Sequence, residues 1–398
     1  MGDVFRIFLR LGLTSFGGPI AHLGYFRREF VERRAWLDEP TFAGIVAFCS
    51  VLPGPTSSQT GMLIGLTRAG AGGAFAAWLG FTAPSAIAMT LVALGLHALR
   101  TGSGMAGSAW FAGLLAGLTA AAAAVVAQAV LALARTLCTD RATQTIALGA
   151  TMLAIAIGGS AGLAWLPIAL GAVAGGLFLR GTNSGITTAT LPVRISRRTA
   201  TGGAIVFLLI VALLFVPERL AAPPVALLET IVRAGTLVFG GGHVVLPLLQ
   251  DLVGNGLLPA REFFAGYGVA QALPGPLFTF AAFIGAANAS VLSGVPGAFV
   301  ATVAVFVPSF ALIFALAPVW NRVCALPGAA AALRGANASV VGLLAGVLYH
   351  PMLTSLEANA RSIGIALAAY ALIDVWKFPP WSVVVASALL GAAAGAFA

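Results

Sequence analysis

The chain has 398 residues, of which 60% are hydrophobic and only 8% are charged, and its formal net charge is +9. Soluble domains carry about 25% charged residues, so this composition excludes a soluble enzyme and predicts a polytopic, multi-pass membrane protein. In such a protein the excess of arginine is typical of loops that set helix orientation, and no nucleic-acid partner is expected.

The first half of the chain, residues 1–179, is predicted to be one domain with six membrane segments. A crossing needs about 20 apolar residues, and the last apolar stretch of this half is long enough for two crossings. The expected segments are 3–24, 41–66, 71–99, 105–134 and two within 144–179.

A basic linker and a single apolar connector helix, at about 202–217, are expected to join the halves within residues 180–222. The second half, residues 223–398, predicts six more segments. They are 225–250, 262–287, 294–319, 327–350, 361–375 and 379–398. The total is about thirteen candidate membrane segments.

Short sequence matches relate the two halves. Three stretches recur at nearly constant offsets of 223, 221 and 224 residues: Arg10–Gly18 at Arg233–Gly241, Leu52–Pro55 at Leu273–Pro276 and Pro84–Ser85 at Pro308–Ser309. Such a period predicts an internal repeat. With six segments in each half, the connector helix inverts the second half relative to the first. The predicted fold class is therefore all-α, with two inverted six-segment repeats.

The basic loops leave the membrane orientation open. If the N-terminus is inside and every segment spans, the arginines of the linker at 180–200 lie inside, as the positive-inside rule requires. The arginines of the loop at 25–40 then lie outside, against the rule. If the segment at 3–24 or the one at 41–66 is re-entrant, both basic loops can face the cytoplasm.

Each half contains a Pro-Gly-Pro sequence inside an apolar segment, at Pro53, Gly54 and Pro55 and at Pro274, Gly275 and Pro276. Proline lacks the backbone N–H and clashes with the preceding turn, so both helices are expected to break there. Broken backbone at membrane depth is tolerated where protein buries it or where it lines a polar cavity. Two such breaks in corresponding places indicate the central site of a transporter; a kink needed only for packing is the alternative.

A helix that restarts after the first break presents unpaired N–H groups, and its partial positive charge favours an anion. The residues expected to bind an anion are Thr56, Ser57, Ser58, Gln59 and, before the second break, Gln271. The second break is followed by Leu277 and Phe278, which carry no hydroxyl, so the halves are chemically unequal.

Arg10 and Arg233 occupy equivalent positions before two glycine clusters. A guanidinium pairs with an oxyanion through its fork of donors, so both are candidate substrate ligands; alternatively, Arg10 extends to the membrane interface. The clusters lack the spacing of nucleotide-binding loops. They either permit close helix packing or bring backbone to an anion, and they are Gly17 with Gly18 and Gly240 with Gly241.

His22 and His243 follow the two glycine clusters. Histidine titrates near neutral pH, so both are candidate proton carriers, and a satisfied structural histidine is the alternative for each. Cys49, Cys138 and Cys324 are scattered without the spacing of a metal site. No metal, cofactor or catalytic residue is expected.

These motifs resemble the CHR family of chromate ion transporters. The residues that carry the resemblance are Leu11–His22, Tyr25–Val31, Trp36–Leu37 and Leu52–Gln59 in the first half, and Phe239–His243, Leu246–Pro247, Gln271–Phe278 and Phe306–Ser309 in the second. They cover both halves, and the chain length resembles that of the long-chain, two-domain members.

The resemblance implies secondary active efflux of chromate, a tetrahedral dianion, across the bacterial inner membrane. It implies that the membrane potential or a proton gradient drives efflux and that efflux confers chromate resistance. Sulfate or a broader set of oxyanions is the alternative substrate, because size, charge and geometry nearly coincide; an intramembrane enzyme is a remote alternative. The expected partners are chromate and the lipid bilayer, and a homodimer is left open.

Overall fold

A computed structural model describes most of the chain, and every regular element in the described part is a helix. The described residues are 1–102, 108–157, 165–179, 193, 195–213, 223–238, 245–249, 256–288, 290, 292–320, 328–353 and 360–396. The all-α prediction is confirmed for these residues.

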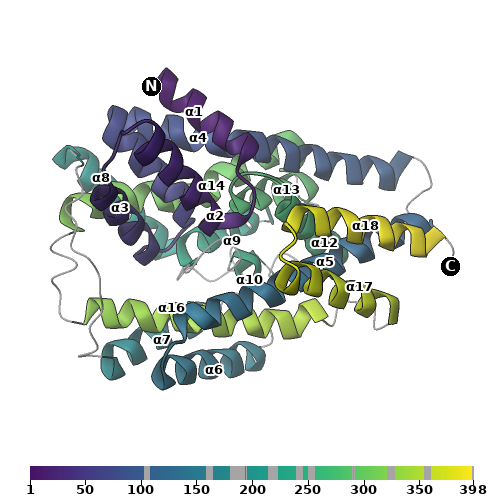
Figure 1. Cartoon of the computed structure of the whole chain (residues 1–398). Coiled ribbons are helices and arrows are strands. Elements are labelled where there is room, and N and C mark those ends of the chain that lie inside the picture. Colours follow the sequence, from purple (N-terminus) through teal and green to yellow (C-terminus); the bar gives the residue numbers. More distant parts are fainter. Residues whose placement is uncertain are drawn as a thin grey trace.

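The first half and the connector hold eight α-helices and one π-helical turn in the described ranges (Figure 1). They are α1 (Gly2–Thr14), α2 (Gly18–Arg27), the π-turn η1 (Arg28–Arg33), α3 (Glu39–Val51), α4 (Thr56–Gly102), α5 (Ala109–Leu137), α6 (Arg141–Ala156), α7 (Trp165–Phe178) and α8 (Arg197–Leu213).

The second half follows with α-helices and short 3₁₀ or π-helical turns. They are α9 (Pro223–Leu237), α10 (Val245–Leu249), α12 (Ala260–Ala272), η6 (Leu277–Thr279), α13 (Phe280–Ala287), α14 (Gly294–Leu316), η7 (Ala317–Val319), α16 (Ala329–Val347), η8 (Leu348–Leu353), α17 (Ala360–Tyr370), η9 (Ala371–Val375) and α18 (Pro380–Ala396).

Four helices in the described part are long and apolar enough to cross a membrane: Thr56–Leu99, Ala109–Leu137, Gly294–Val319 and Ala329–Val347. Large apolar side chains such as Ile87, Leu91 and Phe299 are exposed on two of them, as expected for helices that face lipid. Three shorter apolar helices accompany them. The larger number of crossings that the sequence suggests stays a prediction.

Helix α4 is interrupted near its N-terminal end. Ala69 and Gly70 have non-helical backbone angles, so α4 consists of a short leg before them and a long leg after them. The guanidinium of Arg68 lies over the ring of Trp36, with its Cζ atom 4.9 Å from the ring centroid. Trp36 itself precedes α3 by only three residues.

The chain from α3 to Arg68 therefore forms a helical hairpin. The two legs are α3 and the part of α4 before Ala69, and each has 13 residues, or a length of about 20 Å. The start of α3 and Arg68 nevertheless both lie beside Trp36. Pro53-Gly54-Pro55 therefore lies at the opposite end, at the tip of the hairpin. The segment expected at 41–66 thus returns to the end of the molecule where it starts. This path agrees with the re-entrant alternative, which stays a prediction, and it brings the basic loop at 25–40 and Arg68 to the same end.

Local sequence explains where the hairpin legs begin and end. The Asp38 carboxylate accepts the Thr41 N–H at 2.9 Å and caps α3, as acidic N-cap residues commonly do. At the tip, Leu52 is extended and Gly54 has a φ of 123°, which favours glycine. The proline and glycine residues therefore end one leg and begin the next.

The long helices exchange partners between the two halves (Figure 1). Helix α5 of the first half packs against α17 and α18 of the second, and α16 of the second half packs against α6 and α7 of the first. Glycines permit the close approach, for example where Gly113 meets the backbone of Gly391. Helices of the two halves thus pack against each other along their lengths.

Candidate oxyanion site at the paired chain breaks

Two backbone hydrogen bonds tie each Pro-Gly-Pro break to the other half of the chain. The Gly54 N–H donates to the Val238 carbonyl at 2.5 Å, and the Gly275 N–H donates to the Ser15 carbonyl at 2.9 Å. Ser15 and Val238 each follow the end of an equivalent helix, α1 or α9. The helix ends therefore meet in two pairs, α3 with α9 and α12 with α1, and the N–H groups of both break glycines are already bonded.

The N-terminus of α4 is the part of the first break that can receive an anion. The Gln59 N–H closes the first helical turn on the Pro55 carbonyl at 2.8 Å. The N–H groups of Thr56, Ser57 and Ser58 precede that bond, so helix geometry gives them no intrahelical acceptor. All three side chains are buried. Three backbone donors and three hydroxyls are thus gathered at the positive end of the helix.

The second break offers an anion fewer hydrogen-bond donors than the first. The Thr279 N–H and hydroxyl both donate to the Pro276 carbonyl, at 3.0 Å and 2.8 Å, so the chain restarts as a tight 3₁₀ turn. Only Leu277 and Phe278 precede that closure, and their side chains are buried and apolar. The chemical inequality expected from the sequence is present in the structure.

His22 lies against the first turn of α4. Its Nδ1 atom is 3.2 Å from the Ser57 hydroxyl, and its Nε2 atom is 3.2 Å from the Ser15 carbonyl. The ring is buried and packs edge-on against Phe81. Because a carbonyl oxygen only accepts, Nε2 carries the proton, and in the neutral ring Nδ1 accepts from Ser57.

Gln59 is held at the break by its amide nitrogen. Nε2 donates to the Pro53 carbonyl at 2.7 Å and lies 3.4 Å from the Ser309 hydroxyl. Its Oε1 atom and the Ser58 hydroxyl are buried and have no hydrogen-bond partner among the residues that the structure describes. Gln271, in contrast, contacts the hydroxyl of Tyr267 on its own helix, α12, so the two glutamines have different surroundings.

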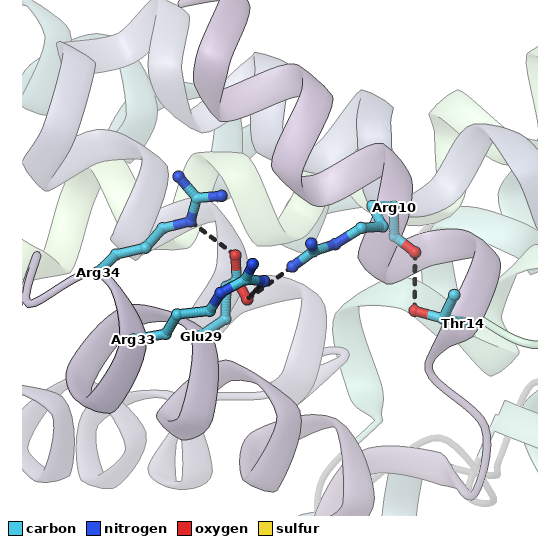
Figure 2. A network of polar contacts seen from close by, with 5 residues as sticks. All are labelled: Arg10, Thr14, Glu29, Arg33 and Arg34. Carbon is cyan, nitrogen blue, oxygen red and sulfur yellow. Dashed lines mark hydrogen bonds and ion pairs between the residues drawn. The ribbon is translucent and has the colours of Figure 1, made fainter.

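The equivalent arginines have opposite environments. Arg10 is half exposed and donates to the buried carboxylate of Glu29 at 2.6 Å, where Arg33 and Arg34 donate as well (Figure 2). The Arg233 side chain is only 4% exposed and pairs with Glu229 at 2.6 Å on the same helix. Arg10 thus belongs to a basic cluster near the loop at 25–40.

The surroundings of Glu29 keep its carboxyl ionised. Burial raises the pKa of this group, but hydrogen bonds from Arg34 and Arg33 and the charge of Arg10 outweigh that effect, so the pKa lies below its ordinary value. Three guanidinium groups share one carboxylate. The cluster therefore carries excess positive charge at a half-exposed surface.

The structure describes only part of the predicted site. Gly17 and Gly18 both have positive φ values, 98° and 76°, and turn the chain between Ser15 and α2. Gly240, Gly241 and His243 lie outside the described residues. Sequence reasoning missed Ser15, Val238 and Ser309, although the recurrence of Pro-Ser in both halves was a signal for the last of these.

Comparison with known proteins decides the family. The sequence model described as Chromate transporter matches residues 2–177 and 225–392. This chain belongs to the chromate transporter family. Because that family consists of membrane transporters, the chain is a transporter and not an enzyme.

Relatives of this chain occur in several bacteria. A chromate transport protein of Pseudomonas aeruginosa is 29% identical over 94% of this chain and 87% of its own length. One of Cupriavidus metallidurans is 27% identical over 96% and 90%, and a probable chromate transport protein of Synechococcus elongatus is 27% identical over 97% and 93%. No solved structure matches the chain.

Proposed function

We propose that this family member exports chromate from the bacterial cytoplasm across the inner membrane, and that the anion binds at the N-terminus of α4. The observation that carries the proposal is the first turn of α4, where the N–H groups and buried hydroxyls of Thr56, Ser57 and Ser58 converge beside His22. Preorganised donors at a helix N-terminus suit a tetrahedral oxyanion. The family supplies the identity of the anion.

An inverted repeat, with halves at 1–179 and 223–398 and a connector at 180–222, is part of the proposal. Two observations support it. The hydrogen bonds of Gly54 and Gly275 to the opposite halves are reciprocal. Helix α3 starts beside Trp36, whereas α12 starts where Arg261 donates to the Ala112 carbonyl in the first turn of α5, at 3.0 Å. These are opposite ends of the long leg of α4.

The basic end of the molecule is proposed to face the cytoplasm. The loop at 25–40 and Arg68 lie together there, and clustered arginines at one membrane face favour the cytoplasmic side. The excess positive charge of the Arg10 cluster would attract anions to that face before export. A homodimer of this chain remains a prediction.

Ion gradients are the proposed source of energy. Moving one charge through 100 mV is worth about 2.3 kcal/mol, so a dianion leaving an inside-negative cell gains about 4.6 kcal/mol per 100 mV. The membrane potential alone can therefore drive export. His22 and His243 are the proposed proton carriers if a proton is exchanged, and resistance of the cell would follow from net efflux.

The test is chromate uptake into inside-out vesicles, with and without an energised membrane and with sulfate as competitor. We expect energy-dependent uptake that sulfate inhibits weakly, and we expect Ser57→Ala and Ser58→Ala each to reduce it. Strong inhibition by sulfate would make the chain a broader oxyanion carrier. Full uptake by the Ser57→Ala, Ser58→Ala double variant would remove the site from the first turn of α4.

A further inference from the structure

We propose that Ser309, which belongs to α14 of the second half, supplies a hydroxyl to the oxyanion site at the first break. Gln59 is its positioning residue. The inference rests on the proposed function and deepens it, because it makes one site out of groups from both halves.

The position of Ser309 places it at the tip of the α3–α4 hairpin. Its Oγ atom lies 3.4 Å from Gln59 Nε2, although 250 residues separate the two in the chain. A Cβ atom on Gly54 would lie 2.7 Å from the same hydroxyl. Ser309 is fully buried. The hydroxyl therefore touches the glycine at the centre of the first break.

Counting hydrogen-bond donors shows that the Ser309 proton is available. Gln59 Nε2 also donates to the Pro53 carbonyl, and a carbonyl oxygen only accepts, so the atom facing Ser309 is the amide nitrogen. Ser309 must then accept from Gln59, and its own proton points elsewhere. Among the residues that the structure describes, no acceptor is bonded to that proton.

Two buried threonine hydroxyls on other long helices, those of Thr119 and Thr302, behave differently. Thr119 donates to the Leu115 carbonyl and Thr302 to the Ala298 carbonyl, one turn earlier in each helix. This back-bonding is the usual way for a hydroxyl in an apolar helix to satisfy its proton. Ser309 is held instead as an acceptor, which leaves a preorganised donor at the break.

Two further buried atoms at this break have no partner within the described part of the chain, and both indicate an occupant. The Ser58 hydroxyl can donate to an oxyanion, whereas Gln59 Oε1 can only accept and therefore suits a water or a protonated oxygen of the anion. Buried polar groups are nearly always hydrogen-bonded in native proteins. An oxyanion held by the first turn of α4 and by Ser309 would satisfy the donors.

Ser85 is the matched control in the first half. It is the sequence equivalent of Ser309, and a Cβ atom on Gly275 would lie 2.7 Å from its hydroxyl. Its proton, however, is already donated to the Thr82 carbonyl at 3.2 Å. The break that it touches is followed by Leu277 and Phe278. Ser85 thus has the same packing role without a free donor.

The experiment compares Ser309→Ala with Ser85→Ala in the purified full-length chain. The first readout is the chromate concentration that gives half-maximal transport in proteoliposomes. The second is the chromate concentration that gives half of the maximal increase in melting temperature in detergent. Hydrogen bonds to charged groups are among the stronger ones, so Ser309→Ala should raise both concentrations about 10- to 100-fold. Ser85→Ala should change them less than about twofold.

A second variant distinguishes the loss of the hydroxyl donor from misfolding of Ser309→Ala. Ser309→Cys keeps the shape of the side chain with a larger sulfur atom in place of oxygen, and its thiol is a weak donor, so the folded variant should show the same loss of chromate affinity. If the wild type transports chromate and neither Ser309 variant differs from Ser85→Ala in half-saturation, the inference is overturned. If the wild type itself does not transport chromate, it is the proposed function that fails.

Discussion

The imidazole of His22 bridges the end of α1 and the beginning of α4, with Nε2 at 3.2 Å from the Ser15 carbonyl and Nδ1 at 3.2 Å from the Ser57 hydroxyl. The same Ser15 carbonyl accepts the Gly275 N–H. His22 therefore connects the proposed anion site to the second break. When the ring is neutral, Ser57 must donate to it; when the ring is protonated, Nδ1 donates and the Ser57 proton is released.

This geometry predicts that His22 couples protonation to anion binding. We expect His22→Ala to lower the chromate transport rate about tenfold or more and to flatten the dependence of that rate on pH. The measurement is initial transport rate against pH in proteoliposomes. His97→Ala is the control, because His97 is exposed near the far end of α4. An unchanged pH profile in His22→Ala would remove His22 from coupling.

Gly54 and Gly275 should not tolerate a side chain. Both have φ in the left-handed region, 123° and 97°, where an L-residue costs about 1–3 kcal/mol, and a Cβ atom would press on Ser309 or Ser85. We expect Gly54→Ala and Gly275→Ala to lower the thermal stability in detergent and to abolish transport. Gly95→Ala, in open space on α4, should be neutral.

The clash at Gly275 offers a sharper version of this prediction. If the Ser85 hydroxyl is the obstacle, the Gly275→Ala, Ser85→Ala double variant should recover part of the stability lost in Gly275→Ala. Backbone strain remains, so the recovery should be incomplete. A double variant as unstable as the sum of the two single changes would show that contact between the added methyl group and the Ser85 hydroxyl is irrelevant to stability.

Local chemistry made the helix breaks predictable from the sequence. The path of the chain after each break depends on non-local contacts and was not predictable in the same way. Proline lacks an N–H wherever it stands, so α3 and α12 end before Pro53 and Pro274 as expected. The return of α4 to Trp36 depends on a contact between Arg68 and an aromatic ring in a different loop. No periodicity within the segment at 41–66 indicates that contact, so crossing and re-entrance stayed equally open.

The two arginines make the same point at the level of single residues. Arg10 and Arg233 are each followed by a glycine two residues later and by Phe-Gly-Gly six residues later, and they occur at equivalent places in α1 and α9. Their exposed fractions nevertheless differ, 48% against 4%. The partner of Arg10 comes from the loop at 25–40, whereas that of Arg233 lies one turn earlier on its own helix. Surroundings of this kind cannot be inferred from a repeated motif.

The basic cluster predicts a pH-dependent stability. The pKa of Glu29 is lowered in the folded chain, so the ionised carboxylate stabilises the fold above the unfolded-state value of about 4.3. That stability is lost as the pH falls through the folded-state pKa. We expect the melting temperature of the wild type to drop below about pH 5 and that of Glu29→Gln to depend less on pH in this range.

Glu32→Gln provides the comparison for this measurement. Glu32 lies in the same loop and pairs with Arg27, but both side chains are about half exposed, and such pairs contribute about 0–1 kcal/mol. Its pH profile should follow that of the wild type. Equal profiles for all three proteins would mean that the Glu29 cluster does not contribute to acid sensitivity.

The contrast between Arg10 and Arg233 gives the last prediction. Arg233→Ala leaves the Glu229 carboxylate, 12% exposed, beside a buried vacancy, and removing one partner of a buried pair costs about 3–5 kcal/mol. Arg10→Ala leaves Glu29 with Arg33 and Arg34 and should cost about 1 kcal/mol or less. The Arg233→Ala, Glu229→Ala double variant should be more stable than Arg233→Ala alone, because it removes the unpaired charge.

Melting temperatures in detergent test the stabilities, and proteoliposome transport tests the substrate role. If Arg10→Ala and the stabilised double variant both transport chromate at the wild-type rate, neither arginine binds the anion, and the donors of the site are those of α4 and Ser309.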